Sequence, residues 1–75
     1  MSIETHILNI ISNFSRKRNW KYGLRQRYLF GVLIGMDYSS NDISDALQRM
    51  EVAKIIYKIY RYGYVYWFVR KEYRN

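Results

Sequence analysis

The stretch MEVAKIIYKIYRYGYVYWFV, residues 50–69, contains the change of period on which the fold depends. Its first part repeats apolar residues at helical spacing, which predicts a helix over about residues 50–62. The apolar stripe consists of Val52, Ile55, Ile56 and Ile59. Gly63 stands where the residue after a helix end belongs. Residues 64–69 are β-branched and aromatic and alternate, which predicts a strand.

Three further helices are predicted upstream, over about residues 3–14, 23–36 and 41–48. The first carries one apolar stripe, formed by Ile3, Ile7, Ile10, Ile11 and Phe14. Ser2 can cap it, and Ser39 with Asp42 has the spacing of a capping box before the third helix. Residues 15–22 are polar and basic and predict a connector that ends at Gly23.

Two glycines lie inside the predicted helix 23–36, Gly31 and Gly35. Each costs about 0.5–1 kcal/mol relative to alanine within a helix. We therefore expect another backbone to approach this helix closely.

Composition limits the class of protein. The 75 residues include 13 Lys and Arg against 6 Asp and Glu, a net charge of +7, with 49% hydrophobic residues. The chain is too apolar for a disordered basic tail and too charged for a membrane span. The longest apolar run, residues 29–36, is too short to cross a bilayer, so we expect a soluble cytoplasmic protein that does not bind membranes.

Chemistry-bearing residues are scarce. The chain has no cysteine and one histidine, His6, so no metal site and no cofactor is expected. Asp42 and Asp45 are three residues apart and could share a magnesium ion, but helix capping accounts for them. No nucleophile-elbow or phosphate-loop motif is present, so we expect neither an enzyme nor a small-molecule substrate.

Charge is segregated along the chain, with two basic blocks on either side of an acidic middle. The predicted helix 50–62 carries Lys54, Tyr57, Lys58 and Arg61 on the face opposite its apolar stripe, and Arg49, Arg70, Lys71 and Arg74 flank it. Such a face can enter the major groove of DNA, where cations neutralise phosphates. A solvated surface is the alternative for any single basic face, and the flanking cations favour DNA contact.

A second basic block interleaves charge with an aromatic ring: Arg16, Lys17 and Arg18 precede Trp20. It can follow a phosphate backbone or stack on a base. The alternative is a solubilising loop whose tryptophan packs on the core.

Two motifs resemble those of the winged helix-turn-helix DNA-binding domain over residues 24–69. The first is Asp42-Ile43-Ser44-Asp45-Ala46-Leu47, and the second consists of Val52, Ile56, Ile59, Gly63, Tyr64 and Val65. The resemblance implies a mainly α fold with a short β element, preceded by an extra N-terminal helix. Residues 1–75 would form a single domain, with the N-terminal helix and connector in 1–23 and the winged helix-turn-helix in 24–75. No Asn-Gly or Asp-Gly turn follows Val69, so the expected wing is a single strand or a truncated hairpin.

The resemblance also implies a function. The chain looks like the small regulators encoded by crenarchaeal viruses and plasmids, which implies a sequence-specific, double-stranded DNA-binding transcriptional regulator. A second copy of the chain on the DNA is expected, and the first helix could serve as its interface or as a lid on its own core. The alternative is a protein-interaction or RNA-binding module that uses the aromatic strand and the basic surface.

Overall fold

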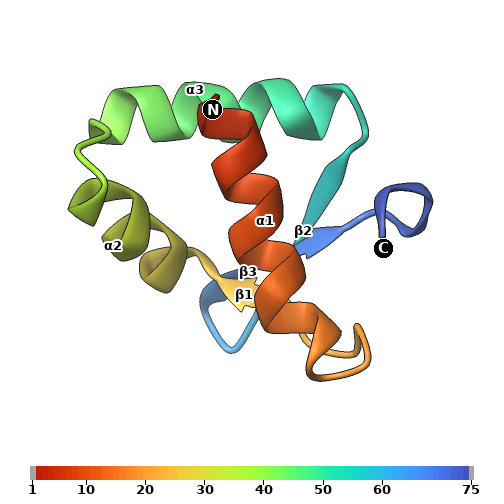
Figure 1. Ribbon diagram of the computed structural model, residues 1–75. Coiled ribbons are helices and arrows are strands. Elements are labelled where there is room, and N and C mark those ends of the chain that lie inside the picture. Colours follow the sequence, from red (N-terminus) through yellow and green to blue (C-terminus); the bar gives the residue numbers. More distant parts are fainter. Residues whose placement is uncertain (1, 75) are drawn as a thin grey trace.

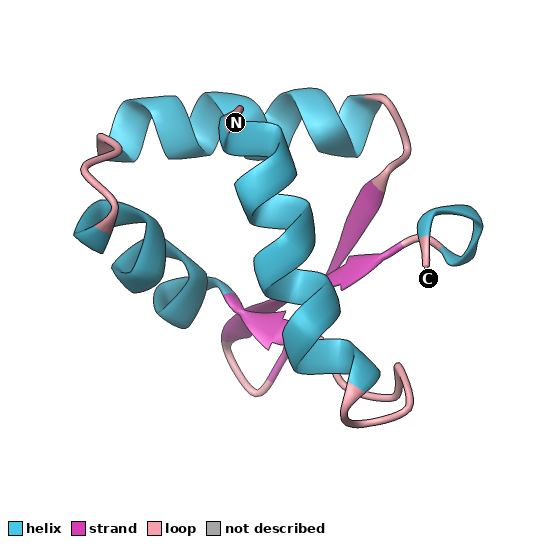
Figure 2. Cartoon of the chain, in the orientation of Figure 1, coloured by secondary structure: helices cyan, strands magenta, loops and turns pink. Residues whose placement is uncertain are grey.

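The computed structural model describes residues 2–74 and has an α+β fold (Figures 1 and 2). Its helices are α1 (Ile3–Arg16), α2 (Gln26–Gly35) and α3 (Ser40–Val52), and its strands are β1 (Leu24–Arg25), β2 (Ile56–Arg61) and β3 (Tyr64–Val69). A short 3-10 helix, Lys71–Tyr73, follows β3. The three strands form one antiparallel sheet in the order β1-β3-β2. The expectation of a mainly α fold with a short β element therefore underestimates the sheet.

Helix α1 forms as predicted and covers the core. The Ser2 hydroxyl accepts a hydrogen bond from the Thr5 backbone N–H at its start. Ile7 and Ile11 are fully buried among the core residues. The helix thus acts as a lid on its own core. It is one of three α-helices in residues 2–74 and is not an addition to three others.

Helix α3 is a single continuous helix where two short ones, 41–48 and 50–62, were predicted. The Ser39 hydroxyl caps its start by accepting a hydrogen bond from the Asp42 backbone N–H. The buried stripe of Ile43, Ala46 and Leu47 continues without a break to Met50. Beyond Val52 the chain turns at Lys54, whose φ is +61°, and the Ile55 N–H bonds back to the Met50 carbonyl at 3.0 Å. This left-handed end terminates the helix.

The predicted helix 50–62 is wrong, because residues 56–61 are the strand β2. All six residues of β2 pair with β3, from Ile56 opposite Val69 to Arg61 opposite Tyr64. Tyr62 and Gly63 connect the strands with φ values of +54° and +79°. Positive φ at both positions is what two-residue type I′ turns require. Gly63 is therefore a hairpin residue and not a helix end, and the hairpin is complete.

The sheet has one face turned to the helices. Leu24, Ile56, Trp67 and Val69 are buried on this face with α1, α2 and α3 around them. The Trp67 indole N–H donates to the Gln26 side-chain carbonyl at 2.9 Å, which ties β3 to the start of α2. The hairpin turn and the connector between α1 and β1 lie at the end of the molecule opposite α3 (Figure 1).

The glycines of α2 do not receive a neighbouring backbone. No atom beyond the helix's own neighbouring backbone lies within 4 Å of where a Cβ of Gly31 or Gly35 would stand. The expected close approach is therefore absent within residues 2–74. None of the helices in this range combines the length and the apolar content needed to cross a membrane.

Candidate nucleic-acid interface

The face of the sheet turned away from the helices is open and aromatic. Side chains alternate along each strand, so every second residue lies on this face. We call it the open face; its side chains are Arg25, Tyr57, Ile59, Arg61, Tyr64, Tyr66 and Phe68. Tyr57, Tyr66 and Phe68 are half-buried, while Tyr64 keeps 47% of its surface exposed.

Phe68 is held in place from two sides. Its ring stacks on that of Tyr57 across the β2–β3 pair, with centroids 5.1 Å apart and planes 8° from parallel. The connector passes so close that a Cβ on Gly23 would stand 2.6 Å from the Phe68 ring. Glycine at this position lets the connector backbone lie directly against the open face.

Two arginines lie over tyrosine rings of the open face. The guanidinium carbon of Arg25 is 3.6 Å from the centroid of Tyr64, and that of Arg70 is 5.3 Å from the centroid of Tyr57. The Nε atoms of Arg25 and Arg70 are buried without a hydrogen-bond partner among the described residues. A cation over the face of an aromatic ring is stabilised without being neutralised.

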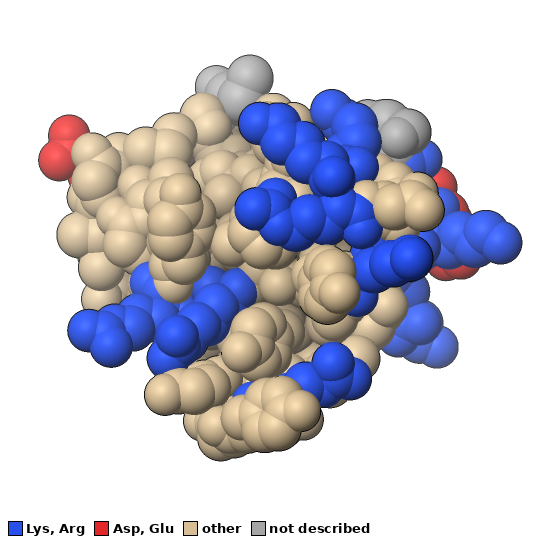
Figure 3. All heavy atoms as spheres, turned by 90° about the horizontal axis from the view of Figure 1, so that it is seen from below, with Lys and Arg blue, Asp and Glu red and all other residues tan. Residues whose placement is uncertain are grey.

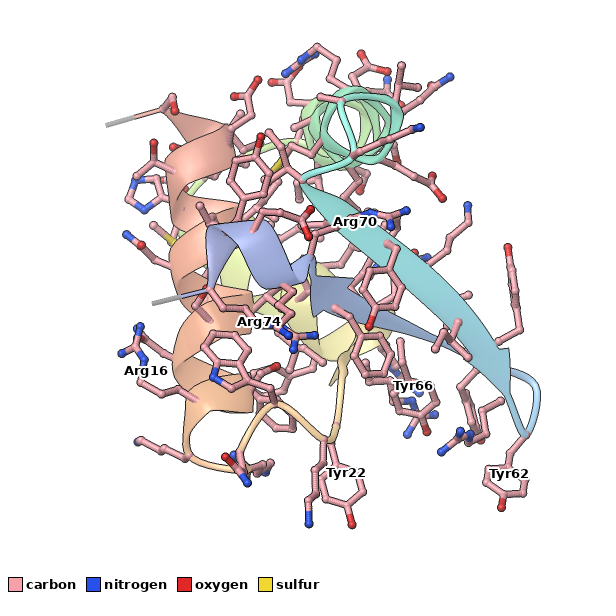
Figure 4. All side chains as sticks on the ribbon, turned by 90° about the vertical axis from the view of Figure 1, so that its right-hand side faces the viewer. Arg16, Tyr22, Tyr62, Tyr66, Arg70 and Arg74 are labelled. Carbon is pink, nitrogen blue, oxygen red and sulfur yellow. The ribbon has the colours of Figure 1, made fainter. Side chains whose placement is uncertain are left out.

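Trp20 packs on the core beneath Arg74. Its ring contacts the core cluster, and the Arg74 guanidinium carbon lies 5.3 Å from the ring centroid. Arg74 also donates from Nε to the Val69 carbonyl at 2.9 Å. Of the two roles considered for Trp20, packing is therefore the one observed. Arg70 and Arg74 lie along the same side of the molecule as Tyr66 (Figure 4).

The basic block at the end of α1 extends the positive surface. Arg16 and Lys17 close the helix, and Arg18 bonds to the Phe14 carbonyl at 2.9 Å and lies over its ring. All three are exposed. Viewed from the end opposite α3, Lys and Arg side chains gather around a band of uncharged side chains, with acidic atoms only at the margins (Figure 3).

A hollow of about 230 Å³ lies between the connector and the hairpin turn. Tyr22 and Lys21 border it from the connector, and Arg61 and Tyr62 border it from the hairpin. Ile59, Tyr66 and Phe68 of the open face complete its lining with Gly23. Figure 4 shows Tyr22 and Tyr62 on either side of the region next to Tyr66.

Strand β2 separates the four residues that were predicted on one helix face, Lys54, Tyr57, Lys58 and Arg61. Tyr57 and Arg61 belong to the open face, whereas Lys58 points to the other side, over the Trp67 ring at 5.6 Å. Lys58 also pairs with Glu51 at 3.5 Å. Lys54 stands in the turn that ends α3. Side chains alternate between two faces in a strand but repeat every 3.6 residues in a helix, which accounts for the separation.

Arg49 is engaged by α1. Its guanidinium donates twice to one Glu4 carboxylate oxygen, at 3.0 and 3.1 Å. A hydrogen bond from the backbone N–H of Glu4 and the bonds from Arg49 lower the pKa of the Glu4 carboxyl. Of the predicted flanking residues, Arg70 and Arg74 lie by the open face, while Lys71 is exposed on the 3-10 helix.

Helix α3 has the opposite charge from the open face. It carries Asp42, Asp45 and Glu51 against Arg49, a net charge of −2, so the rest of the chain carries +9. Within residues 2–74 the ion pairs are Glu4–Arg49 and Glu51–Lys58, and both involve α3. The cations of the open face have no carboxylate partner in this range.

Three residues of the site were not predicted: Tyr22, Arg25 and Tyr62. Lys21 belongs to the second basic block, and Tyr64, Tyr66 and Phe68 belong to the aromatic strand of the alternative function. The signal that could have found Tyr62 is the hairpin, two aromatic and β-branched runs joined by Tyr62-Gly63. In the described part of the chain, no three His, Cys, Asp or Glu side chains converge on a possible metal position.

Known protein families, characterised proteins and solved structures give no match to this chain.

Proposed function

We propose that this protein binds nucleic acid through the open face of the sheet and the cations around it. The observation that carries the proposal is the separation of charge: Lys and Arg side chains gather around uncharged side chains at the end opposite α3 (Figure 3), whereas both ion pairs of residues 2–74 involve α3. Phosphates are the partners that such cations favour, and aromatic rings offer surfaces for bases.

The contacts of the arginines support this proposal. The guanidinium carbons of Arg25 and Arg70 lie over tyrosine rings and have no carboxylate partner among the described residues, so their charge remains available to an external anion. Guanidinium groups recognise phosphate oxygens through several N–H donors at once. The basic block at the end of α1 adds three more exposed cations on the same end of the molecule.

A salt titration tests the proposal. Fluorescence anisotropy with a labelled oligonucleotide, single-stranded and as a duplex, should show a linear fall of log affinity with log salt. The slope counts the phosphates neutralised, at about 0.7–0.9 per contact. Absence of binding to both forms at low salt would overturn the proposed function.

A second candidate is a sequence-specific regulator of duplex DNA with a winged-helix architecture. The observation that favours it is topological: the order helix, strand, two helices and a hairpin, with β3 between β1 and β2, is compatible with a helix-turn-helix and a wing. In this arrangement α3 would be the recognition helix. Its exposed uncharged polar residues are Ser40, Asn41, Ser44 and Gln48. Its net charge of −2 makes the hairpin and connector the source of phosphate contacts.

Selection of bound sequences from a random duplex pool tests this second candidate. If α3 contacts base edges, Gln48→Ala and Ser44→Ala should change the preferred sequence, at about 1–3 kcal/mol per base contact. Two copies per site are expected, because one small module buries only about 600–1,000 Å² on DNA. Equal affinity for all duplexes would contradict the candidate.

A further inference from the structure

The hollow at the end of the open face has the features of a small binding pocket. It measures about 230 Å³, and the rings of Tyr22, Tyr62, Tyr66 and Phe68 line it. Lys21 and Arg61 also border it, one from the connector and one from the end of β2. The pocket therefore combines aromatic walls with positive charge from two sides.

The walls of the pocket are held by the fold. Phe68 is fixed between Gly23 and Tyr57. Tyr66 lies opposite Ile59 in the β2–β3 register, and a tight two-residue turn sets the position of Tyr62. Phe68 and Tyr66 are therefore in position before a ligand enters, which favours affinity.

The chemistry of the lining identifies a ligand that is flat, apolar on its faces and attached to anions. A neutral apolar ligand would gain nothing from the positive charges of Lys21 and Arg61, whereas an anion beside the ring would. A nucleobase meets the requirement, since it stacks on aromatic rings and carries a phosphate on each side along the strand. Bases in a duplex are paired and stacked, so only an unpaired base can enter a pocket.

We propose that this pocket receives one unpaired nucleobase, with Lys21 and Arg61 contacting the adjacent phosphates. The inference rests on the proposed function and narrows it to strands that expose unpaired bases: single strands, loops or frayed ends. The hydroxyls of Tyr22 and Tyr62, both largely exposed, can bond the edge of the base or a phosphate.

Binding of oligothymidine by matched tyrosine variants tests the proposal. Tyr22→Ala removes a pocket wall, and Tyr60→Ala removes a similarly exposed tyrosine from the opposite face of β2. Loss of one base-stacking contact lowers affinity by roughly 5- to 150-fold. We expect that loss for Tyr22→Ala on the single strand only, with duplex affinity unchanged, and no change for Tyr60→Ala on either.

A second variant tests the proposal by filling the pocket instead of removing one of its walls. Ile59 lies in the pocket lining with 37% of its surface exposed, so Ile59→Trp fills the pocket and adds an aromatic ring at the same time. If the pocket receives a base, single-strand affinity falls. If the open face acts only as a flat stacking surface, affinity rises and the pocket proposal is wrong.

The outcomes separate this inference from the proposed function. Salt-dependent binding that neither Tyr22→Ala nor Ile59→Trp weakens would overturn the pocket and leave nucleic-acid binding standing. Equal losses on duplex and single strand would also overturn it, since a duplex offers no base to the pocket. Absence of binding to any oligonucleotide would overturn both. Circular dichroism of each variant checks that the fold is retained.

Discussion

Two charged side chains of α3 pair with other elements of the fold, whereas two arginines by the open face of the sheet lie over aromatic rings. Arg49 bonds to Glu4 of α1, and Glu51 pairs with Lys58 of β2. Arg25 and Arg70 rest on Tyr64 and Tyr57 instead. A paired charge is already satisfied, while a cation on a ring keeps its attraction for an external anion. The number of basic residues alone therefore does not locate a binding surface.

Removing charge from each region should have different effects on nucleic-acid affinity. At about 0.1 M salt, loss of two phosphate contacts lowers affinity by roughly 25- to 60-fold and reduces the salt slope by about 1.4–1.8. We expect this for the double variant Lys21→Ala, Arg61→Ala, because both residues border the pocket on the basic side.

The control for this experiment is Arg49→Ala, which removes one positive charge from α3. Affinity should change by less than about two-fold, since Arg49 is engaged with Glu4 and no phosphate contact is lost. Anisotropy titrations over a range of salt measure both variants. A large loss of nucleic-acid affinity for Arg49→Ala would place the binding surface on α3 instead of the open face.

Substitution of Gly23 should destabilise the protein by about 1–3 kcal/mol. The new methyl of Gly23→Ala would stand 2.6 Å from the Phe68 ring, which is itself stacked on Tyr57 and cannot move freely. Urea unfolding measures the change. Gly31→Ala is the matched control: no neighbouring atom lies within 4 Å there, so helix propensity should stabilise the protein by about 0.5–1 kcal/mol. Equal changes in the free energy of unfolding for the two variants would show that the connector at Gly23 does not pack closely on Phe68.

Loss of the Ser39 cap should lower the stability of the protein without changing its affinity for nucleic acid. Ser39→Ala removes the acceptor for the Asp42 backbone N–H and should lower the free energy of unfolding by about 1 kcal/mol. Nucleic-acid affinity should stay the same wherever the protein is folded, because the hairpin turn and the connector, which border the pocket, lie at the end of the molecule opposite α3. A parallel loss of affinity would support α3 as the binding element.

Removal of the Glu4–Arg49 ion pair should change the free energy of unfolding least. The pKa of Glu4 is lowered in the folded state, so its contribution to stability is present at neutral pH. That contribution is lost as the pH falls below the ordinary glutamate value of about 4.3 and through the lowered pKa. Both side chains are substantially exposed, which limits the contribution to a few tenths of a kcal/mol. Glu4→Gln should remove this part of the acid dependence in urea unfolding curves, and an unchanged curve would show that the pair adds nothing.

Local signals in the sequence determined much of the secondary structure. The isoleucine stripe and Ser2 predicted α1, Ser39 predicted the start of α3, and the alternation in residues 64–69 predicted β3 with its observed ends. Each of these signals acts between residues a few positions apart, through capping hydrogen bonds or through the apolar period. No distant partner is needed to recognise them.

Strand β2 depended on a partner and was predicted wrongly. Ile56 and Ile59 are three residues apart, and Lys54, Lys58 and Arg61 follow one another at intervals of four and three, spacings that suit one face of a helix. In the structure the pairing with β3 and the positive φ values of Tyr62 and Gly63 override this local period. Propensity is a weak preference that a hairpin with six paired positions overcomes.

The candidate site shows the same division. Tyr57, Arg61, Arg70 and Arg74 could be named from the sequence because they are basic or aromatic and close to one another. The separation of Lys58 from Arg61, and the meeting of Lys21 with Arg61 across 40 positions of sequence, follow only from the antiparallel sheet and from the path of the connector over it. Side-chain direction in a strand is set by its pairing register, and that register is a property of the tertiary structure.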